Sequence, residues 1–271
     1  MQKHTHDLVF TADEVHKRFV TWDDGEADRE WRCLSAIHEH ARGVAPRPLR
    51  REMWGSRPVV VTERLPGDPL GDRPLSAEQT VALGRALSRL YAIPVDAIAA
   101  AAITERRYGP STLPQLLSQW PDEPYDLSQC RERAEVAIGV DTARAWLEDS
   151  PALPEPRLVG LGISDLNPAN ILWDGESCRL VDFEDGGLTD PSYDLADHVE
   201  HIAGRLSGVF DADRLADAVG LSPEDRARMQ AYRPLWAIFW LVMLLPGNGA
   251  FRRNPPGTTE VQARHLMRLL R

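Results

Sequence analysis

The chain has 271 residues, enough for one large domain or for two lobes that share a cleft. It is 43% hydrophobic and 27% charged, a composition typical of folded globular proteins, which argues against intrinsic disorder. Its net charge of −10 argues against nucleic acid as a partner, because phosphate backbones are bound by basic surfaces.

The cysteines and the apolar runs bear on the compartment. Cys33, Cys130 and Cys178 form neither a CxxC pair nor a metal spacing, so we expect buried thiols in a reducing environment. The N-terminus has no apolar signal region, and the longest apolar run, residues 235–245, is shorter than the about 20 residues of a membrane span. We therefore expect a cytoplasmic protein without a membrane span, in which residues 235–245 form a core helix.

The first 65 residues predict a small, β-rich lobe. Residues 8–11 and 15–20 predict two short strands joined by a turn, and the β-branched segment 58–65 predicts a third strand. Between them, apolar residues at helical spacing predict a helix over about residues 26–42. The turn-forming run Pro66-Gly67-Asp68-Pro69 follows, so we place the lobe boundary between residues 65 and 66.

Residues 66–271 predict a larger, helical lobe, which makes the expected fold class α+β. Ser76-Ala77-Glu78-Gln79 has the form of a capping box and opens a helix that Pro94 ends. Ser222-Pro223 precedes another helix in the same way. Further helices, separated by proline-rich loops, are expected over residues 113–120, 130–138 and 142–147.

Chemistry-bearing residues concentrate between residues 158 and 201. Asp165 and Asn170 flank a loop that contains proline, and the strand-like segment after Asn170 turns at Asp174-Gly175 into a second apolar strand that ends at Asp182. Such a hairpin brings Asn170 close to Asp182, so that two oxygen-bearing side chains meet where a hard cation can bind. Phosphoryl transfer needs this arrangement, because a carboxylate must orient the attacking hydroxyl and a metal must neutralise the phosphates.

Asp165-x4-Asn170, followed by Asp182-Phe183-Glu184 and later by Asp194-Leu195-Ala196, resembles the catalytic and metal-binding loops of the aminoglycoside phosphotransferase/choline kinase-like superfamily. These proteins are relatives of the protein kinases, so the resemblance implies a bilobed protein-kinase-like fold. It also implies that Asp165 is the catalytic base, that Asn170 and Asp182 bind Mg²⁺, and that Asp194 braces the catalytic loop.

Upstream, the resemblance is one of position. Lys17 stands where the family's strand lysine reaches the nucleotide phosphates, although a solvated edge lysine and a competing Arg18 are alternatives. Glu30 stands where the next helix supplies the partner of that lysine, and an exposed helix glutamate is an equal alternative. The end of the third strand resembles the hinge whose backbone binds the nucleotide base, at residues Thr62, Glu63, Arg64 and Leu65.

The chain departs from the family pattern in three places. Ile163 replaces a histidine that usually precedes the catalytic aspartate by two residues, which puts the conformation of that loop in question. No glycine-rich phosphate loop is visible before Lys17, and only fourteen residues precede Val15, so we expect either a missing strand in the small lobe or a misassigned start site. Tyr91 lies at a helix end where relatives often carry histidine.

Other polar and aromatic groups have plainer interpretations. Glu184 and Asp185 are expected to be solvated surface acids, and the alternative is that they help to hold a second metal or repel a wrong substrate. His198 and His201 lie three apart on a predicted helix without a third ligand, which excludes a zinc site. A cluster at helical spacing is expected to be core, namely Trp236, Phe239 and Trp240. The chain also lacks the Gly-x-Ser-x-Gly, Walker and Rossmann motifs of the main competing enzyme classes.

These observations predict a small-molecule kinase that uses Mg²⁺ and either ATP or GTP. The expected acceptor is a hydroxyl of a small, cationic molecule such as an aminoglycoside, because the larger lobe contains acidic residues. Sugars, amino alcohols and peptide antibiotics are alternative acceptors. A nucleotide- or ligand-binding pseudokinase without turnover is the alternative, and a metal-assisted hydrolase built on Asp165, Asp182 and Glu184 is a third hypothesis. The oligomeric state is left open.

Overall fold

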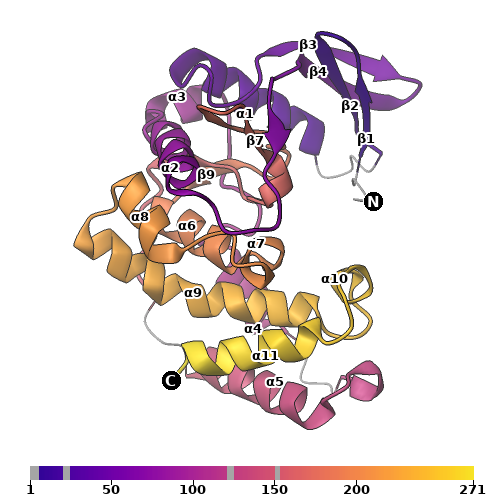
Figure 1. Ribbon diagram of the computed structural model, residues 1–271, viewed down its shortest axis with the longest axis vertical. Helices are drawn as coiled ribbons and strands as arrows, with labels where there is room; N and C mark the ends of the chain where they lie inside the picture. Colours follow the sequence, from indigo (N-terminus) through magenta and orange to yellow (C-terminus); the bar gives the residue numbers. More distant parts are fainter. Residues whose placement is uncertain (1–5, 21–24, 121–124, 150–152) are drawn as a thin grey trace.

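A four-stranded antiparallel sheet forms the N-terminal part of the molecule (Figure 1). β1 (Asp7–Phe10) and β2 (Glu14–Arg18) form the predicted hairpin, and β2 pairs with β4 (Arg57–Glu63) in the order β1-β2-β4-β3. β4 is rich in β-branched residues, as is typical of strands, and its Val60 is buried in the hydrophobic core. The structure is a computed structural model that describes residues 6–20, 25–120, 125–149 and 153–271.

The fourth strand, β3 (Pro48–Trp54), was not predicted from the sequence. It is an edge strand that pairs only with β4 in the described sheet, and five of its seven residues are exposed. Its charged residues are typical of strands that avoid pairing with other chains, and they hide the alternation that marks a half-buried strand. The signal that was overlooked is Gly55-Ser56, a two-residue hairpin turn between Trp54 and Arg57.

The predicted helix after the first hairpin is α1 (Glu26–His40), which packs against β3 and β4. Leu34 and Ile37 are fully buried beneath the sheet, as their helical spacing predicts. Glu30 lies on the same buried face, although it is charged. A buried carboxylate needs a partner, and this one is found in the candidate site described below.

Two small sheets carry the motif-rich part of the chain. β5 (Asp68–Pro69), β7 (Ile171–Trp173) and β8 (Cys178–Leu180) form one, and β6 (Gly160–Gly162) and β9 (Gly187–Thr189) form the other. The predicted hairpin is confirmed, with Ile171 opposite Leu180. Because β5 pairs with β7, residues 68–69 are tied to the motif-rich part of the chain and not to the N-terminal sheet. The lobe boundary between residues 65 and 66 is consistent with this pairing and stays a prediction.

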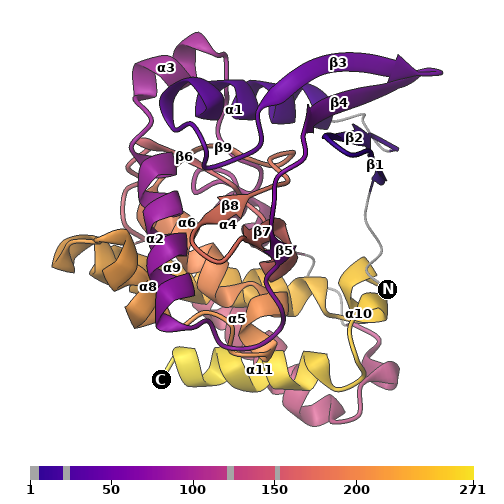
Figure 2. The same ribbon diagram turned by 45° about the horizontal axis from the view of Figure 1, so that its top comes forward.

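The remainder is helical, and the predicted α+β class is confirmed (Figures 1 and 2). The capping box at Ser76 and Gln79 is present in the structure. The helices are α2 (Ala77–Tyr91), α3 (Val95–Ala100), α4 (Leu113–Ser118), α5 (Arg133–Glu148), α6 (Pro191–Glu200), α7 (Ile202–Leu206), α8 (Ala212–Val219), α9 (Pro223–Met243), α10 (Gly249–Arg253) and α11 (Thr258–Leu269), with short 3₁₀ turns at Leu127–Gln129 and Pro168–Asn170.

The prediction of two helices over residues 130–138 and 142–147 was wrong, because α5 is continuous. Gly139, which lies between the two predicted segments, permits close packing. A Cβ atom at this position would lie 2.7 Å from the Cβ of Ala263 in α11. The glycine is therefore explained by the contact between α5 and α11, since a missing side chain lets two helices approach.

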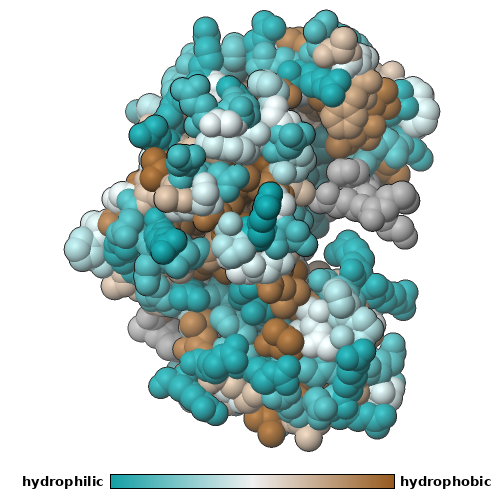
Figure 3. Space-filling model, viewed as in Figure 1, coloured by the Kyte–Doolittle hydropathy of each residue, from teal (hydrophilic) through white to brown (hydrophobic). Residues whose placement is uncertain are grey.

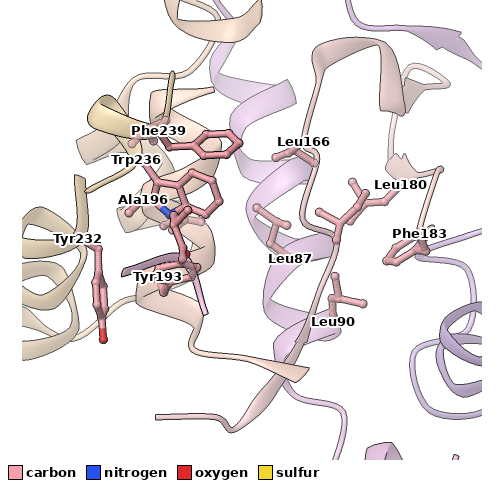
Figure 4. Packing of buried hydrophobic residues seen from close by; sticks show 14 of the residues in the cluster. Leu87, Leu90, Leu166, Leu180, Phe183, Tyr193, Ala196, Tyr232, Trp236 and Phe239 are labelled. Atoms are coloured by element: carbon pink, nitrogen blue, oxygen red, sulfur yellow. The ribbon is translucent and has the colours of Figure 1, made fainter. Parts of the chain in front are cut away.

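The core of the larger part lies directly beneath the motif-rich loops. In Figure 4, Trp236 and Phe239 of α9 pack with Tyr193 of α6, while Leu87 of α2 faces Leu166. The predicted core role of Trp236 and Phe239 is thus confirmed. Residues 235–243 of the apolar run belong to α9, which also contains Pro234, and Leu244 and Leu245 follow the end of the helix at Met243. No helix in the described part of the chain is long and apolar enough to cross a membrane.

Gly84→Ala is expected to destabilise the protein, because α2 and α8 touch at this residue. A Cβ atom at Gly84 would lie 2.5 Å from the backbone carbon of Ala218, which cannot move without shifting α8. Overpacking of this kind costs about 1–3 kcal/mol and exceeds the gain in helix propensity of about 1 kcal/mol. Urea unfolding measures the difference, and Gly249→Ala, in helix α10, is the matched control because its Cβ atom would meet nothing within 4 Å. Equal stability of the two variants would contradict the tight contact.

Candidate active site

Lys17 lies among three carboxylates that come from distant parts of the chain. From β2, its Nζ lies 2.5 Å from Oε2 of Glu30 on α1 and 2.7 Å from Oε2 of Glu184, and it also bonds Asp182. The structure therefore brings Lys17, Glu30 and Asp182 together. Arg18 points elsewhere, since its guanidinium lies 4.4 Å from the ring centre of Trp54.

The cluster carries more carboxylate than one ammonium neutralises. Burial opposes the charge of Lys17, but Asp182, Glu30 and Glu184 outweigh it and raise the pKa of Lys17. Burial raises the pKa of Glu30 to about 7, against the attraction of Lys17. Burial also raises the pKa of Asp182. Such an excess of buried negative charge is relieved when a cation binds.

The carboxylates of this cluster are ligands of the kind that a hard divalent cation prefers, and in this structure the ammonium of Lys17 lies among them. Glu30, Asp182 and Glu184 each offer an oxygen, and these atoms lie within 4.8 Å of one another. The expectation that Glu184 is a solvated surface acid was wrong, because its side chain is largely buried against Lys17. Asp185 is half-buried and pairs with Arg107 at 3.3 Å, so it too is more than a surface charge.

His6 is a member of the cluster that the sequence did not reveal. Its Nε2 lies 2.8 Å from Oε2 of Glu184, and its Nδ1 accepts a hydrogen bond from the backbone of Val20 at 3.1 Å. The ring is buried against Phe19. A single histidine ahead of the first strand carries no pattern, so only the fold could place it here.

Asp165 stands on the loop between β6 and the turn Pro168–Asn170. The side-chain nitrogen of Asn170 donates to the backbone oxygen of Asp165 at 3.1 Å, and the backbone oxygen of Asn170 accepts from Val181, next to Asp182, at 2.9 Å. The hairpin thus connects Asp165, Asn170 and Asp182, and the amide nitrogen of Asn170 is bonded to the loop of Asp165.

Two non-glycine residues of this region have left-handed backbone conformations. Ser164 has φ 74° and Asp182 has φ 76°. This conformation is unfavourable for residues with a side chain and persists only where surrounding contacts impose it. Both residues lie beside candidate functional groups, which is where such strain concentrates in proteins.

Arg106 is the residue that holds Ser164, and no sequence pattern indicated this role. Its guanidinium is buried, bonds Asp194 at 2.5 Å and Asp197, and donates to the backbone oxygen and the hydroxyl of Ser164 at 3.0 and 2.9 Å. Asp194 therefore reaches the loop of Asp165 through Arg106. Burial opposes its ionisation, but His198 and Arg106 lower the pKa of Asp194 to about 2.

A sequence model of the phosphotransferase enzyme family matches residues 15–232, a span that includes Lys17, Glu30, Asp165 and Asp182. The chain belongs to this family. It is therefore a phosphotransferase, as the motifs predicted. A comparison with curated proteins gives no significant match.

Solved structures share the fold of this phosphotransferase. A choline/ethanolamine kinase family protein from Mesorhizobium loti has a TM-score of 0.63 at 19% identity, over 97% of this chain and 84% of that one. Spectinomycin phosphotransferase in complex with ADP and spectinomycin has a TM-score of 0.57 at 14% identity, over 98% of this chain and 88% of that one. A thermostable mutant of an aminoglycoside phosphotransferase, in a ternary complex with AMP-PNP and hygromycin B, has a TM-score of 0.54 at 19% identity. The match covers 97% of this chain and 93% of that one. The bilobed protein-kinase-like fold is thus confirmed.

The departures from the family pattern have structural counterparts in this phosphotransferase. Ile163 is fully buried in the core, and Arg106 supplies the polar support of the adjacent Ser164. Tyr91 donates its hydroxyl proton to Asp194 at 3.0 Å, a bond that a histidine could also make. The turn between β1 and β2 contains no glycine and closes through a bond from Thr11 to Glu14 at 2.9 Å.

The residues predicted to bind the nucleotide base lie at the end of β4, and they do not all face the same way. Val60 is paired with Lys17, and Thr62 lies two residues further along β4. Because side chains of a strand alternate between the two faces, Thr62 lies on the same sheet face as Lys17. The carboxylate of Glu63 accepts from the backbone of Arg47 at 2.9 Å. Arg64 folds back onto the oxygen of Thr11 at 2.9 Å, and Leu65 leads into the segment before β5.

Proposed function

We propose that this phosphotransferase moves the γ-phosphoryl group of ATP or GTP to a hydroxyl of a small, cationic acceptor such as an aminoglycoside. The observation that carries the proposal is the convergence of Lys17, Glu30 and Asp182 beside the loop of Asp165. The similar structures support it, since one contains ADP with spectinomycin and another AMP-PNP with hygromycin B.

Each residue of the site has a role in this reaction. Lys17, held by Glu30, binds the nucleotide phosphates, and Asp165 accepts a hydrogen bond from the acceptor hydroxyl and aligns it. The hydroxyl oxygen bonds to the γ-phosphorus as the bond to the β-phosphate oxygen breaks. The nucleoside diphosphate leaves, and the hydroxyl proton passes to Asp165 and then to solvent.

Mg²⁺ is part of the proposal, and when bound it neutralises the charge of the phosphates. Asn170 and Asp182 are the proposed ligands, and Glu184 is a further candidate because its oxygen lies close to that of Asp182. The backbone of four residues at the end of β4 would bind the nucleotide base, namely Thr62, Glu63, Arg64 and Leu65.

The acceptor is inferred from charge. Figure 3 shows that the face in view is mostly hydrophilic. The chain carries a net charge of −10, so a polycationic acceptor would be attracted over a distance. Aminoglycosides meet this description, and a part in antibiotic resistance would follow. A cytoplasmic location belongs to the same proposal.

Consumption of nucleotide with a panel of acceptors tests the proposal and identifies the acceptor. We expect one class among aminoglycosides, amino alcohols and sugars to stimulate release of ADP or GDP from the wild-type enzyme. Removal of Mg²⁺ with EDTA should abolish this release, and added Mg²⁺ should restore it. Phosphate release from a phosphate ester without nucleotide would instead support a metal-assisted hydrolase.

A nucleotide-binding pseudokinase is the second candidate. It is favoured by the absence of glycine in the turn Ala12-Asp13 and by Ile163 on the catalytic loop. Thermal unfolding with Mg²⁺ and nucleotide separates the two candidates. An increase in Tm without any phosphorylated product from the panel would support the pseudokinase, and acceptor-stimulated turnover would exclude it.

A further inference from the structure

His201 joins the loop of Asp165 to the helices beneath it. It lies between α6 and α7, and its Nε2 is 2.9 Å from Oδ1 of Asp165. The histidine is 7% exposed, and the ring of Trp240 from α9 meets it edge-on at 4.7 Å. The side chain of Asp165, in contrast, is 52% exposed. A fixed imidazole therefore holds one oxygen of a carboxylate that remains accessible to a ligand.

A backbone hydrogen bond determines which nitrogen of the His201 ring carries the proton. The N–H of Ala203 donates to Nδ1 at 3.3 Å, and a ring nitrogen can accept this bond only when it carries no proton. The proton of the neutral ring is therefore on Nε2, which lies against Asp165. The protonated Nε2 thus lies 2.9 Å from Oδ1 of Asp165, at a position that α6 and α7 set.

We propose that His201 is a positioning residue for phosphoryl transfer. By holding Oδ1, the Nε2–H group selects one orientation of the Asp165 carboxylate and directs its other oxygen to the acceptor hydroxyl. The inference rests on the proposed function, in which Asp165 aligns that hydroxyl. A half-exposed carboxylate otherwise samples several rotamers, and alignment of the reacting groups is where much of the catalytic advantage arises.

His201 orients Asp165 but does not relieve it of a proton. Nε2 already carries a hydrogen, so it cannot accept the proton that Asp165 takes from the hydroxyl unless it first loses its own. The contribution is therefore geometric. It should affect kcat more than the KM of the nucleotide, since His201 contacts neither Lys17 nor the carboxylates around it.

A structural role for His201 also exists and must be separated from the proposed one. Its Nδ1 makes it the N-cap of α7, which alone could explain its burial. The two roles use different atoms. Asparagine at this position keeps an oxygen for the N–H of Ala203 but is too short to reach Asp165. Glutamine keeps a donor near the place of Nε2 but is a poor N-cap.

The test compares His201→Gln with His201→Asn in the full chain, using the acceptor found with the wild type. We expect His201→Gln to retain kcat within about threefold, and His201→Asn to lose about 10- to 100-fold, with the nucleotide KM unchanged in both. Thermal unfolding should rank them the other way, with His201→Asn the more stable. Equal kcat values, or a higher kcat for His201→Asn, would overturn the proposal.

A measurement that needs no turnover separates this inference from the proposed function. In ¹⁵N NMR spectra of the imidazoles, we expect Nε2 of His201 to be protonated, Nδ1 to be unprotonated, and the Nε2 signal to shift in Asp165→Ala. If Nδ1 carries the proton, or if the Nε2 signal is unchanged in that variant, the inference fails. If the spectra agree but the wild type has no turnover with any acceptor, the proposed function fails and the positioning role fails with it.

Discussion

Asp165→Asn is expected to lower kcat for phosphoryl transfer by about 10²- to 10⁴-fold. Asparagine has nearly the same shape, but its amide cannot accept the proton of the acceptor hydroxyl. Nucleotide binding should persist, because Lys17 and its carboxylate partners are unchanged. Steady-state kinetics with the stimulating acceptor give kcat, and a nucleotide titration followed by thermal shift gives the affinity.

The control for this variant is Asp213→Asn, which makes the same chemical change on an exposed residue of α8. Its kcat should equal that of the wild type. Full phosphoryl transfer by Asp165→Asn or Asp165→Ala would remove Asp165 from the reaction and with it the proposed mechanism. A loss of nucleotide affinity parallel to the loss of kcat would show that the substitution disturbs the whole site.

The part of the site that could be predicted from the sequence is the local part. Asn170 and Asp182 are separated by one hairpin, and strand patterns on both sides of Asp174-Gly175 indicate that hairpin directly. Asp165 is connected to Asn170 through a short loop. Within such a segment, residue spacing nearly determines which side chains approach each other, so a motif gives geometry as well as chemistry.

The part that could not be predicted depends on contacts between distant segments. Arg106 reaches Asp194 across 88 residues and Ser164 across 58, and Glu184 becomes buried only because Lys17 and His6 fold over it. The sequence does not distinguish a buried arginine from a solvated one, because neither residue type nor periodicity differs between them. Lys17 and Glu30 were assigned by position in the family pattern, because a strand lysine alone has no preferred partner.

The same limit explains the errors in secondary structure. β3 is exposed and charged because it is an edge strand, and Gly139 reflects contact with Ala263 in α11 and not a helix end. In both cases the residue type is explained by what lies next to it in the folded protein, namely solvent for β3 and α11 for Gly139, and the sequence does not show this neighbour. His201 belongs to this group as well, since spacing drew attention to it as a metal ligand while its partner, Asp165, is 36 residues away.

Arg106→Met is expected to lower the free energy of unfolding by about 3–5 kcal/mol at neutral pH. Methionine fills a similar volume, but it leaves the carboxylates of Asp194 and Asp197 buried without their cation. Ser164 also loses the two bonds that maintain its left-handed backbone. Urea unfolding of the full chain measures the effect. The control is Arg51→Met, which breaks a solvent-exposed pair with Asp28 and should change stability little.

The pH dependence identifies the cause of that loss. Wild-type Asp194 has a pKa of about 2, below the ordinary value of 3.8, so its stabilising contribution is complete above 3.8 and disappears as the pH falls toward 2. Without Arg106 the pKa of Asp194 is lowered less, so ionised Asp194 contributes less to the stability of the variant and less of it is lost at low pH. The deficit of Arg106→Met should therefore be largest at neutral pH and should shrink as the pH falls, first as Asp197, whose pKa is raised by burial, gains a proton and then as Asp194 does. A deficit independent of pH would attribute the loss to packing, and a deficit no larger than that of Arg51→Met would mean that the buried ion pairs contribute no net stability.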